Sequence, residues 1–160
     1  MDVSNREQVK EVAKQAMDQI GPVDFLINNA GVYSQGEILD LTDNQISKSL
    51  IVNAESHFWT VKEFLPSMLE RNTGHIVTIS SIAGQAGTPG MTHYNASKFA
   101  CYGFSEALRT EMKRKKSSVK VTTISPYYIN TGMFDGVNTT SLYPILEMKP
   151  AVTRIMNAIL

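Results

Sequence analysis

A tyrosine and a lysine four positions apart, Tyr94 and Lys98, form a pair that can carry proton-transfer chemistry. Side chains at positions i and i+4 of a helix project from the same face, so both can reach one substrate. A phenol has a pKa of about 10, and a lysine ammonium beside it favours the phenolate and lowers that pKa. Tyr94 could then exchange a proton with a hydroxyl or carbonyl oxygen. Chance alone gives roughly 0.4 such pairs in a chain of this composition, so the spacing needs support from other residues.

Two further polar residues could complete this pair. Ser81 could donate a hydrogen bond to the same substrate oxygen as negative charge develops on it. Asn53 stands on an otherwise apolar helical stripe, where a side-chain amide must find hydrogen-bond partners or destabilise the fold. It is either a core asparagine bonded to the backbone or the residue that holds a water molecule for a proton relay through Lys98. The pattern leaves both interpretations open.

Alternating helical and strand patterns predict the elements that position these residues. Strands are expected over 23–27, 75–80 and 119–124. Helices are expected from a capping box at Ser4-x-x-Glu7 to residue 20, from a second box at Thr42-x-x-Gln45 to about residue 70, and from about 93 to 112. Pro66 predicts a kink or break in the second helix. The buried stripe of that helix is expected to contain Ile46, Leu50, Asn53, His57 or Phe58, Val61 and Leu65. This order predicts one α/β domain over residues 1–160, with parallel strands and helices on both faces of the sheet.

Polar side chains follow each of the three predicted strands. They are Asn28-Asn29 after the first, Ser80-Ser81 after the second and Ser125 before Pro126 after the third. Ligands of parallel sheets bind at the carboxyl ends of the strands. We therefore expect these three segments to line one cleft.

Composition excludes several other classes of protein. Lys+Arg and Asp+Glu both number 15, so the zero net charge gives no reason to expect binding to nucleic acid. One cysteine, Cys101, and three scattered histidines form neither a disulfide nor a zinc ligand cluster, and no metal site is expected. No apolar run is as long as a membrane span, and the polar first residues do not resemble a signal peptide. We expect an intracellular, reducing environment, cytoplasmic for this chain.

At this point the motifs resemble the signature of the short-chain dehydrogenase/reductase family, from Asp2 to about Met133. The matching segments, in family order and spacing, are Asn28-Asn29-Ala30-Gly31, Asn53, Ser80-Ser81-Ile82-Ala83-Gly84 and Tyr94-Asn95-Ala96-Ser97-Lys98. The resemblance implies a Rossmann-type doubly wound parallel sheet and NAD or NADP as cofactor.

The resemblance also assigns roles to individual residues. It implies that Tyr94 is the general acid/base and that Lys98 lowers the pKa of Tyr94 and binds the nicotinamide ribose. Ser81 would position the substrate oxygen, and Asn53 would support the proton relay. Asp2 and Val3 resemble the acidic turn beside the adenine. The remaining cofactor contacts implied by the family pattern are Asn28, Ala30, Gly31, Pro126, Ile129 and Thr131.

Finer motifs resemble the retinol dehydrogenase and 17-beta-hydroxysteroid dehydrogenase branch, most closely the epidermal retinol dehydrogenases. They include His57-Phe58-Trp59, Leu65-Pro66-Ser67-Met68 and Asn130-Thr131-Gly132-Met133-Phe134. The branch implies a lipophilic alcohol or ketone as substrate, and the apolar loop over 127–134 fits one, although core packing explains it equally well. A homodimer through helices 42–70 and 93–116 is possible. The resemblance places a full-length form at the endoplasmic reticulum or lipid-droplet membrane.

Three departures from the family pattern stand out. No Gly-rich phosphate-binding turn precedes Asp2, no final strand follows Leu160, and Tyr127 stands where the family usually has glycine after Pro126. The sheet is therefore expected to be partial, with an apolar edge beside 23–27, and tight dinucleotide binding by this chain alone is not expected. The alternative to an enzyme is a truncated, non-catalytic form that binds a full-length relative.

Overall fold

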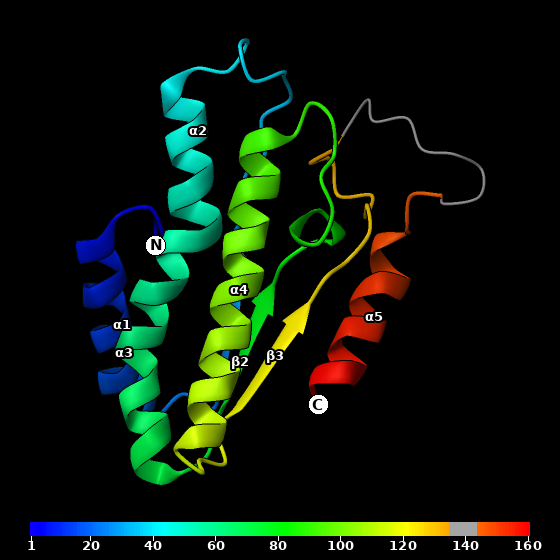
Figure 1. The fold of residues 1–160 in the computed structure, drawn as a ribbon. Coiled ribbons are helices and arrows are strands. Elements are labelled where there is room, and N and C mark those ends of the chain that lie inside the picture. The colour runs from blue at the N-terminus through cyan, green and yellow to red at the C-terminus, as the bar shows by residue number, and fades with distance from the viewer. Residues whose placement is uncertain (135–143) are drawn as a thin grey trace.

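The computed structural model of the 160-residue chain describes residues 1–134 and 144–160. Three parallel strands, β1 (Phe25–Asn28), β2 (His75–Ile79) and β3 (Lys120–Ile124), form a sheet in the order β1-β2-β3. His75 is the register partner of both Phe25 and Lys120. All three carboxyl ends therefore lie at one edge of the sheet (Figure 1). This arrangement confirms the predicted α/β class with parallel strands.

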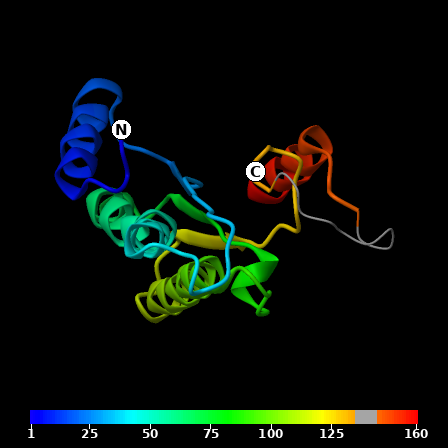
Figure 2. The same cartoon turned by 90° about the horizontal axis from the view of Figure 1, so that it is seen from above.

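The described residues form five α-helices: α1 (Arg6–Ile20), α2 (Asp43–Leu50), α3 (Ser56–Arg71), α4 (Thr92–Arg114) and α5 (Met148–Ile159). Figure 2 shows α3 and α4 on one face of the sheet and α5 on the other, while α1 packs against α3. Helix α5 was not among the helices expected from the sequence. None of the helices in the described residues is both long enough and apolar enough to cross a membrane.

The main core lies between the sheet and the pair α3 and α4. Its centre is a set of buried apolar side chains from all of these elements: Val61, Met68, Ile76, Leu108, Met112 and Val119. Leu26 and Val121 pack against this set from the two outer strands. Burial of an apolar side chain of this size contributes about 1.5–3 kcal/mol each. The core thus fixes α4, and with it the Tyr94–Lys98 pair, against the strand ends.

The ends of the helices agree only in part with the predicted signals. The capping box at Thr42 and Gln45 is confirmed, with both reciprocal hydrogen bonds present. The box expected at Ser4 is wrong, because Asn5 caps α1 by accepting from Gln8 N, while the Ser4 hydroxyl donates to Asp2. The expected break at Pro66 is also absent, since α3 continues to Arg71. Pro66 is exposed, so solvent can satisfy the carbonyl that the proline leaves without a donor.

A π-helical turn at Ile51–Glu55 joins α2 to α3 and changes which side chains are buried. Leu50, expected on the buried stripe, is 39% exposed, and of the alternatives His57 and Phe58 it is His57 that is buried, while Phe58 is 50% exposed. Ser49, Val52 and Ser56 are buried in addition to the expected Asn53 and His57. The π-turn holds more residues per turn than an α-helix, so the buried face before and after it does not follow one 3.6-residue period. Such turns are frequent at functional sites, and this one contains Asn53.

Candidate active site

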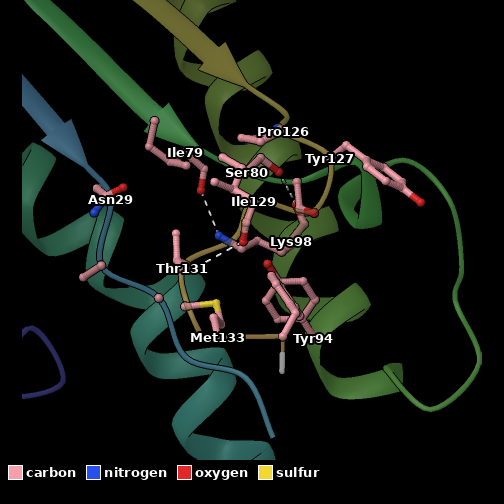
Figure 3. A pocket seen from close by; sticks show the side chains of 14 residues that line it. Asn29, Ile79, Ser80, Tyr94, Lys98, Pro126, Tyr127, Ile129, Thr131 and Met133 are labelled. Atoms are coloured by element: carbon pink, nitrogen blue, oxygen red, sulfur yellow. Dashed lines mark hydrogen bonds between the residues drawn. The ribbon is translucent and has the colours of Figure 1, made fainter. Parts of the chain in front are cut away.

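A cavity of about 450 Å³ opens at the carboxyl ends of the three strands. All three segments that were predicted to meet contribute to it, through Asn29, Ser80–Ser81 and Pro126 (Figure 3). The complete lining consists of Asn29, Ala30, Gly31, Ile79, Ser80, Ser81, Tyr94, Lys98, Pro126, Tyr127, Ile129, Thr131, Met133 and Phe134.

Ser81 and Tyr94 meet on the wall of this cavity. Ser81 follows β2 in extended conformation, and its hydroxyl accepts a hydrogen bond of 3.1 Å from Ala83 N at the start of a 3₁₀ turn over Ile82–Gly84. The Tyr94 side chain, which is 5% exposed, lies beside Ser81 and lines the same cavity. The two hydroxyls can therefore hydrogen-bond one substrate oxygen together.

Lys98 projects from the next turn of α4, and its head group binds the end of a strand. Its Nζ donates to the carbonyl oxygen of Ile79 over 2.8 Å and lies 5.7 Å from the centre of the Tyr94 ring (Figure 3). Burial lowers the pKa of Lys98, and no carboxylate is among its neighbours in the described part of the chain. Among the described residues that line the cavity, Lys98 is the only lysine, arginine, histidine, aspartate or glutamate.

The ionisation of Tyr94 differs from the sequence-based expectation. Burial raises its pKa to about 12, although the hydrogen bond from Ser81 acts in the opposite direction. The expected lowering by Lys98 is absent in this arrangement, because the ammonium binds the Ile79 carbonyl rather than the phenol oxygen. Tyr94 is therefore a protonated phenol at neutral pH, ready to donate a hydrogen bond or a proton.

Asn53 lies behind the cavity instead of lining it. Its Oδ1 accepts from Val32 N over 2.8 Å, and its Nδ2 donates to Val32 O over 2.9 Å and to Ser97 Oγ over 3.0 Å. A backbone-bonded core asparagine is one of the two interpretations left open above, and these bonds match it. Asn53 remains close to the site, since a Cβ built on Gly31 would lie 3.6 Å from Asn53 Oδ1 and 3.9 Å from Lys98 Nζ.

The structure brings most of the expected cofactor-binding residues to the cavity. Tyr94, Lys98 and five others line it: Ala30, Gly31, Pro126, Ile129 and Thr131. Asn28 does not, because it is buried and its Oδ1 accepts from Thr60 Oγ1 on α3. Asp2 and Val3 also lie outside its lining, and the Asp2 carboxylate accepts from Ser4.

Several lining residues were not among the expected cofactor contacts: Asn29, Ile79, Ser80, Tyr127, Met133 and Phe134. Of these, Asn29 and Ser80 belong to the strand-end segments that were expected to line the cleft. Strand alternation could have identified Asn29, because consecutive residues point to opposite sides of a strand and Asn28 continues the inward series of Leu26. Ile79 could have been identified as the last residue of β2. Met133 and Phe134 belong to the apolar loop that was linked to substrate instead of cofactor.

A second cavity of about 340 Å³ adjoins the first. Its lining is mainly apolar and aromatic: Ser81, Ile82, Ala83, Ala86, Thr88, Met91, Tyr94, Tyr127, Tyr128 and Phe134. Four of these residues also line the first cavity, namely Ser81, Tyr94, Tyr127 and Phe134. The two hydroxyls of the candidate catalytic pair thus stand on the wall that the cavities share.

The first cavity has the chemistry needed for the nicotinamide end of a dinucleotide. Ile79, Ile129 and Met133 offer apolar contact to a flat ring, and Thr131 offers a hydroxyl to an amide. Lys98 offers an ammonium to ribose hydroxyls. The loop after β1 runs close to Asn53 and Lys98 at Gly31.

Comparison with known proteins identifies the family. The short chain dehydrogenase family model matches residues 1–142. Short-chain dehydrogenase/reductase family 16C member 6 of Bos taurus is 49% identical over 99% of this chain and 51% of its own length. Human epidermal retinol dehydrogenase 2 is 46% identical over 99% of this chain and 52% of its own length, and human estradiol 17-beta-dehydrogenase 11 is 42% identical over 100% and 53%.

A solved structure gives the same result. A short-chain dehydrogenase from Streptomyces avermitilis superposes with a TM-score of 0.76 and 28% identity, covering 89% of this chain and 54% of its own. The chain spans about half the length of the curated relatives that it matches. With its Tyr94–Lys98 pair, Ser81 and the strand-end cavity on one edge of a parallel sheet, the chain belongs to the short-chain dehydrogenase family.

Proposed function

We propose that the protein is an NAD- or NADP-dependent oxidoreductase that interconverts a hydroxyl and a carbonyl group on a lipophilic substrate. The observation that carries this proposal is the position of Ser81 and Tyr94. Their side chains lie side by side on the wall shared by the cavity that contains Lys98 and the mainly apolar second cavity. A reacting carbonyl carbon at that wall has one cavity on each side. Hydride transfer between a bound cofactor and a bound substrate requires such an arrangement.

The residues of the first cavity would hold the nicotinamide end of the cofactor. The bound cofactor supplies or accepts the hydride. Lys98 would bind ribose hydroxyls, and Thr131 and the segment Asn29–Gly31 would orient the ring end. To reach the ribose, the Lys98 ammonium would have to share or leave the Ile79 carbonyl, which now accepts its hydrogen bond.

Ser81 and Tyr94 would act on the substrate oxygen. Ser81 would donate a hydrogen bond to it, and Tyr94 would transfer the proton. With a pKa of about 12, Tyr94 is protonated at neutral pH and suited to donate that proton to a carbonyl oxygen as it becomes a hydroxyl. In the opposite direction Tyr94 would accept the proton, which requires a lower pKa and hence a closer Lys98 ammonium.

The second cavity supports the proposed substrate class. Met91, Tyr128 and Phe134 provide an apolar and aromatic lining, and its 340 Å³ volume lies at the lower end of the range of small-molecule sites. Two of the similar proteins are named for retinol and estradiol, both lipophilic alcohols. A retinoid, a steroid or a long-chain alcohol or ketone is therefore the proposed substrate.

Replacing the Tyr94 hydroxyl tests the function directly. In Tyr94→Phe the ring contacts remain but the proton donor is lost, so kcat with a lipophilic substrate should fall by roughly 10²–10⁴-fold. Cofactor affinity, measured by calorimetric titration, should change little, because the ribose contact is assigned to Lys98. Tyr102→Phe is the matched control, since Tyr102 lies on α4 outside both cavities and its removal should leave kcat unchanged. Wild-type turnover in Tyr94→Phe would contradict the proposal.

A further inference from the structure

Two aromatic rings from distant parts of the chain enclose the ring of Tyr94. Tyr33, in the loop after β1, meets it edge-on with the ring centres 5.5 Å apart and an angle of 75°. Phe134, in the segment after β3, meets it at 5.7 Å and 81°. Tyr33 and Phe134 also contact each other at 5.1 Å, so the three rings close a triangle. Such edge-to-face pairs contribute about 0.5–1.5 kcal/mol each beyond their buried area.

Each enclosing ring is itself fixed by a neighbour outside the triangle. Tyr33 lies parallel to the buried ring of His93, with centres 6.0 Å apart and an angle of 11°. Val32, the residue before Tyr33, donates its N–H to Asn53 Oδ1 and accepts a hydrogen bond at its carbonyl oxygen from Asn53 Nδ2. Phe134 packs against Tyr128 at 5.0 Å. Neither enclosing ring can turn away from Tyr94 without breaking contacts of its own.

We propose that Tyr33 and Phe134 form an aromatic clamp that positions the Tyr94 side chain and keeps solvent away from it, an inference that rests on the proposed role of Tyr94 as proton donor. Tyr33 lines neither cavity, so it is a positioning residue that acts through Tyr94. Phe134 lines both cavities, so its loss should also affect binding.

The clamp explains why Tyr94 stays protonated. Burial is the largest cause of its raised pKa, and both clamp rings pack against the Tyr94 ring. The titratable groups that face Tyr94 are Lys98 and Cys101 on α4, Tyr33, and Tyr128 after β3. If one clamp ring is removed, water reaches the phenol and the pKa of Tyr94 should fall from about 12 towards its ordinary value of 10.

The test compares Tyr33→Leu with Tyr33→Phe in the whole protein. Tyr33→Phe keeps the ring and should behave as wild type. Tyr33→Leu should lower kcat about tenfold through misplacement of Tyr94, with little change in the KM for substrate. Tyr102→Leu, a tyrosine on α4 outside both cavities, is the control for removal of a ring.

A second readout does not depend on turnover. In protein labelled with ¹³C-tyrosine, the Tyr94 resonance is assigned by its loss in Tyr94→Phe and is followed through an alkaline titration by NMR. The midpoint should fall in Tyr33→Leu and in Phe134→Leu, but not in Tyr33→Phe. An unchanged midpoint and unchanged kcat in Tyr33→Leu would overturn the clamp. Turnover retained in Tyr94→Phe would instead overturn the proposed function, and the titration would still decide whether the clamp exists.

Discussion

Gly84 is the residue at which the site is least tolerant of an added atom. A Cβ there would lie 2.5 Å from the carbonyl oxygen of Lys98 and 2.7 Å from Ser80 Oγ, which donates to that same carbonyl. The 3₁₀ turn that follows Ser81 can therefore approach α4 only because position 84 has no side chain. Gly84→Ala should destabilise the fold by about 1–3 kcal/mol and lower turnover, because the strand end and α4 must move apart. Urea unfolding measures the loss. Gly87→Ala, where a Cβ meets nothing within 4 Å, is the control, and equal stability of the two variants would contradict the prediction.

His57 should make stability depend on pH. Burial lowers its pKa from 6.5 to about 4, and the nearby Lys98 acts in the same direction. The unfolded chain therefore takes up a proton at higher pH than the folded protein does. The free energy of unfolding should be greatest above about pH 6.5 and fall, by on the order of 3 kcal/mol, as the pH drops towards 4.

Urea unfolding of the wild type and of His57→Gln across this pH range checks the assignment. The variant should lose most of the pH dependence between about pH 4 and 6.5. His75→Gln is the comparison, since burial also lowers the pKa of His75, but it stands on β2 and contacts Thr122 instead of facing Lys98. If stability depended less on pH in His75→Gln than in His57→Gln, the assignment of the pH dependence to His57 would be wrong.

Among the elements, the π-helical turn before α3 shows what sequence periodicity can and cannot predict. The apolar spacing predicted a helix through this region and placed Asn53 on its buried side, which is confirmed. A single 3.6-residue period cannot represent a wider turn, so Leu50 was assigned to the core in error. The hydrogen bonds that Asn53 makes to Val32 and Ser97 join three elements, and no local pattern specifies such partners.

For the whole molecule, the sequence predicted the features that depend on local motifs but not those that depend on long-range packing. Tyr94 and Lys98 share one helix, so their spacing alone placed them together, and the strand ends placed Ser81 beside them. The ring contacts of Tyr33 and Phe134 depend on two loops more than 90 positions apart in the chain, and nothing in either loop predicts the other. The pKa of Tyr94 was expected to be lowered but is raised to about 12, because burial is the largest cause of its shift and the Lys98 ammonium binds the Ile79 carbonyl instead of the phenol.

We expect two copies of the chain to associate through the surface formed by α2, α3 and α4. Phe58 and Phe99 are 50% and 47% exposed, and Leu50 on α2 is 39% exposed. The ring of Phe58 lies 4.4 Å from that of Phe104, so side chains of α3 and α4 meet at the surface. A second copy that covered Phe58 and Phe99 would gain on the order of 1 kcal/mol from each, as half of such a side chain becomes buried.

Sedimentation velocity over a range of concentrations tests this association. Phe58→Glu or Phe99→Glu places a charge in the proposed interface, where burial without a partner is unfavourable. Each substitution should therefore raise the dissociation constant of the dimer at least tenfold. Leu39→Glu is the matched control, because Leu39 is 95% exposed in the loop before α2 and away from both helices. Dissociation constants that are equal in Phe58→Glu, Phe99→Glu and Leu39→Glu would show that these helices do not form the interface. Weaker association in the two phenylalanine variants alone would place the contact on α3 and α4. Helix α4 also carries Tyr94 and Lys98.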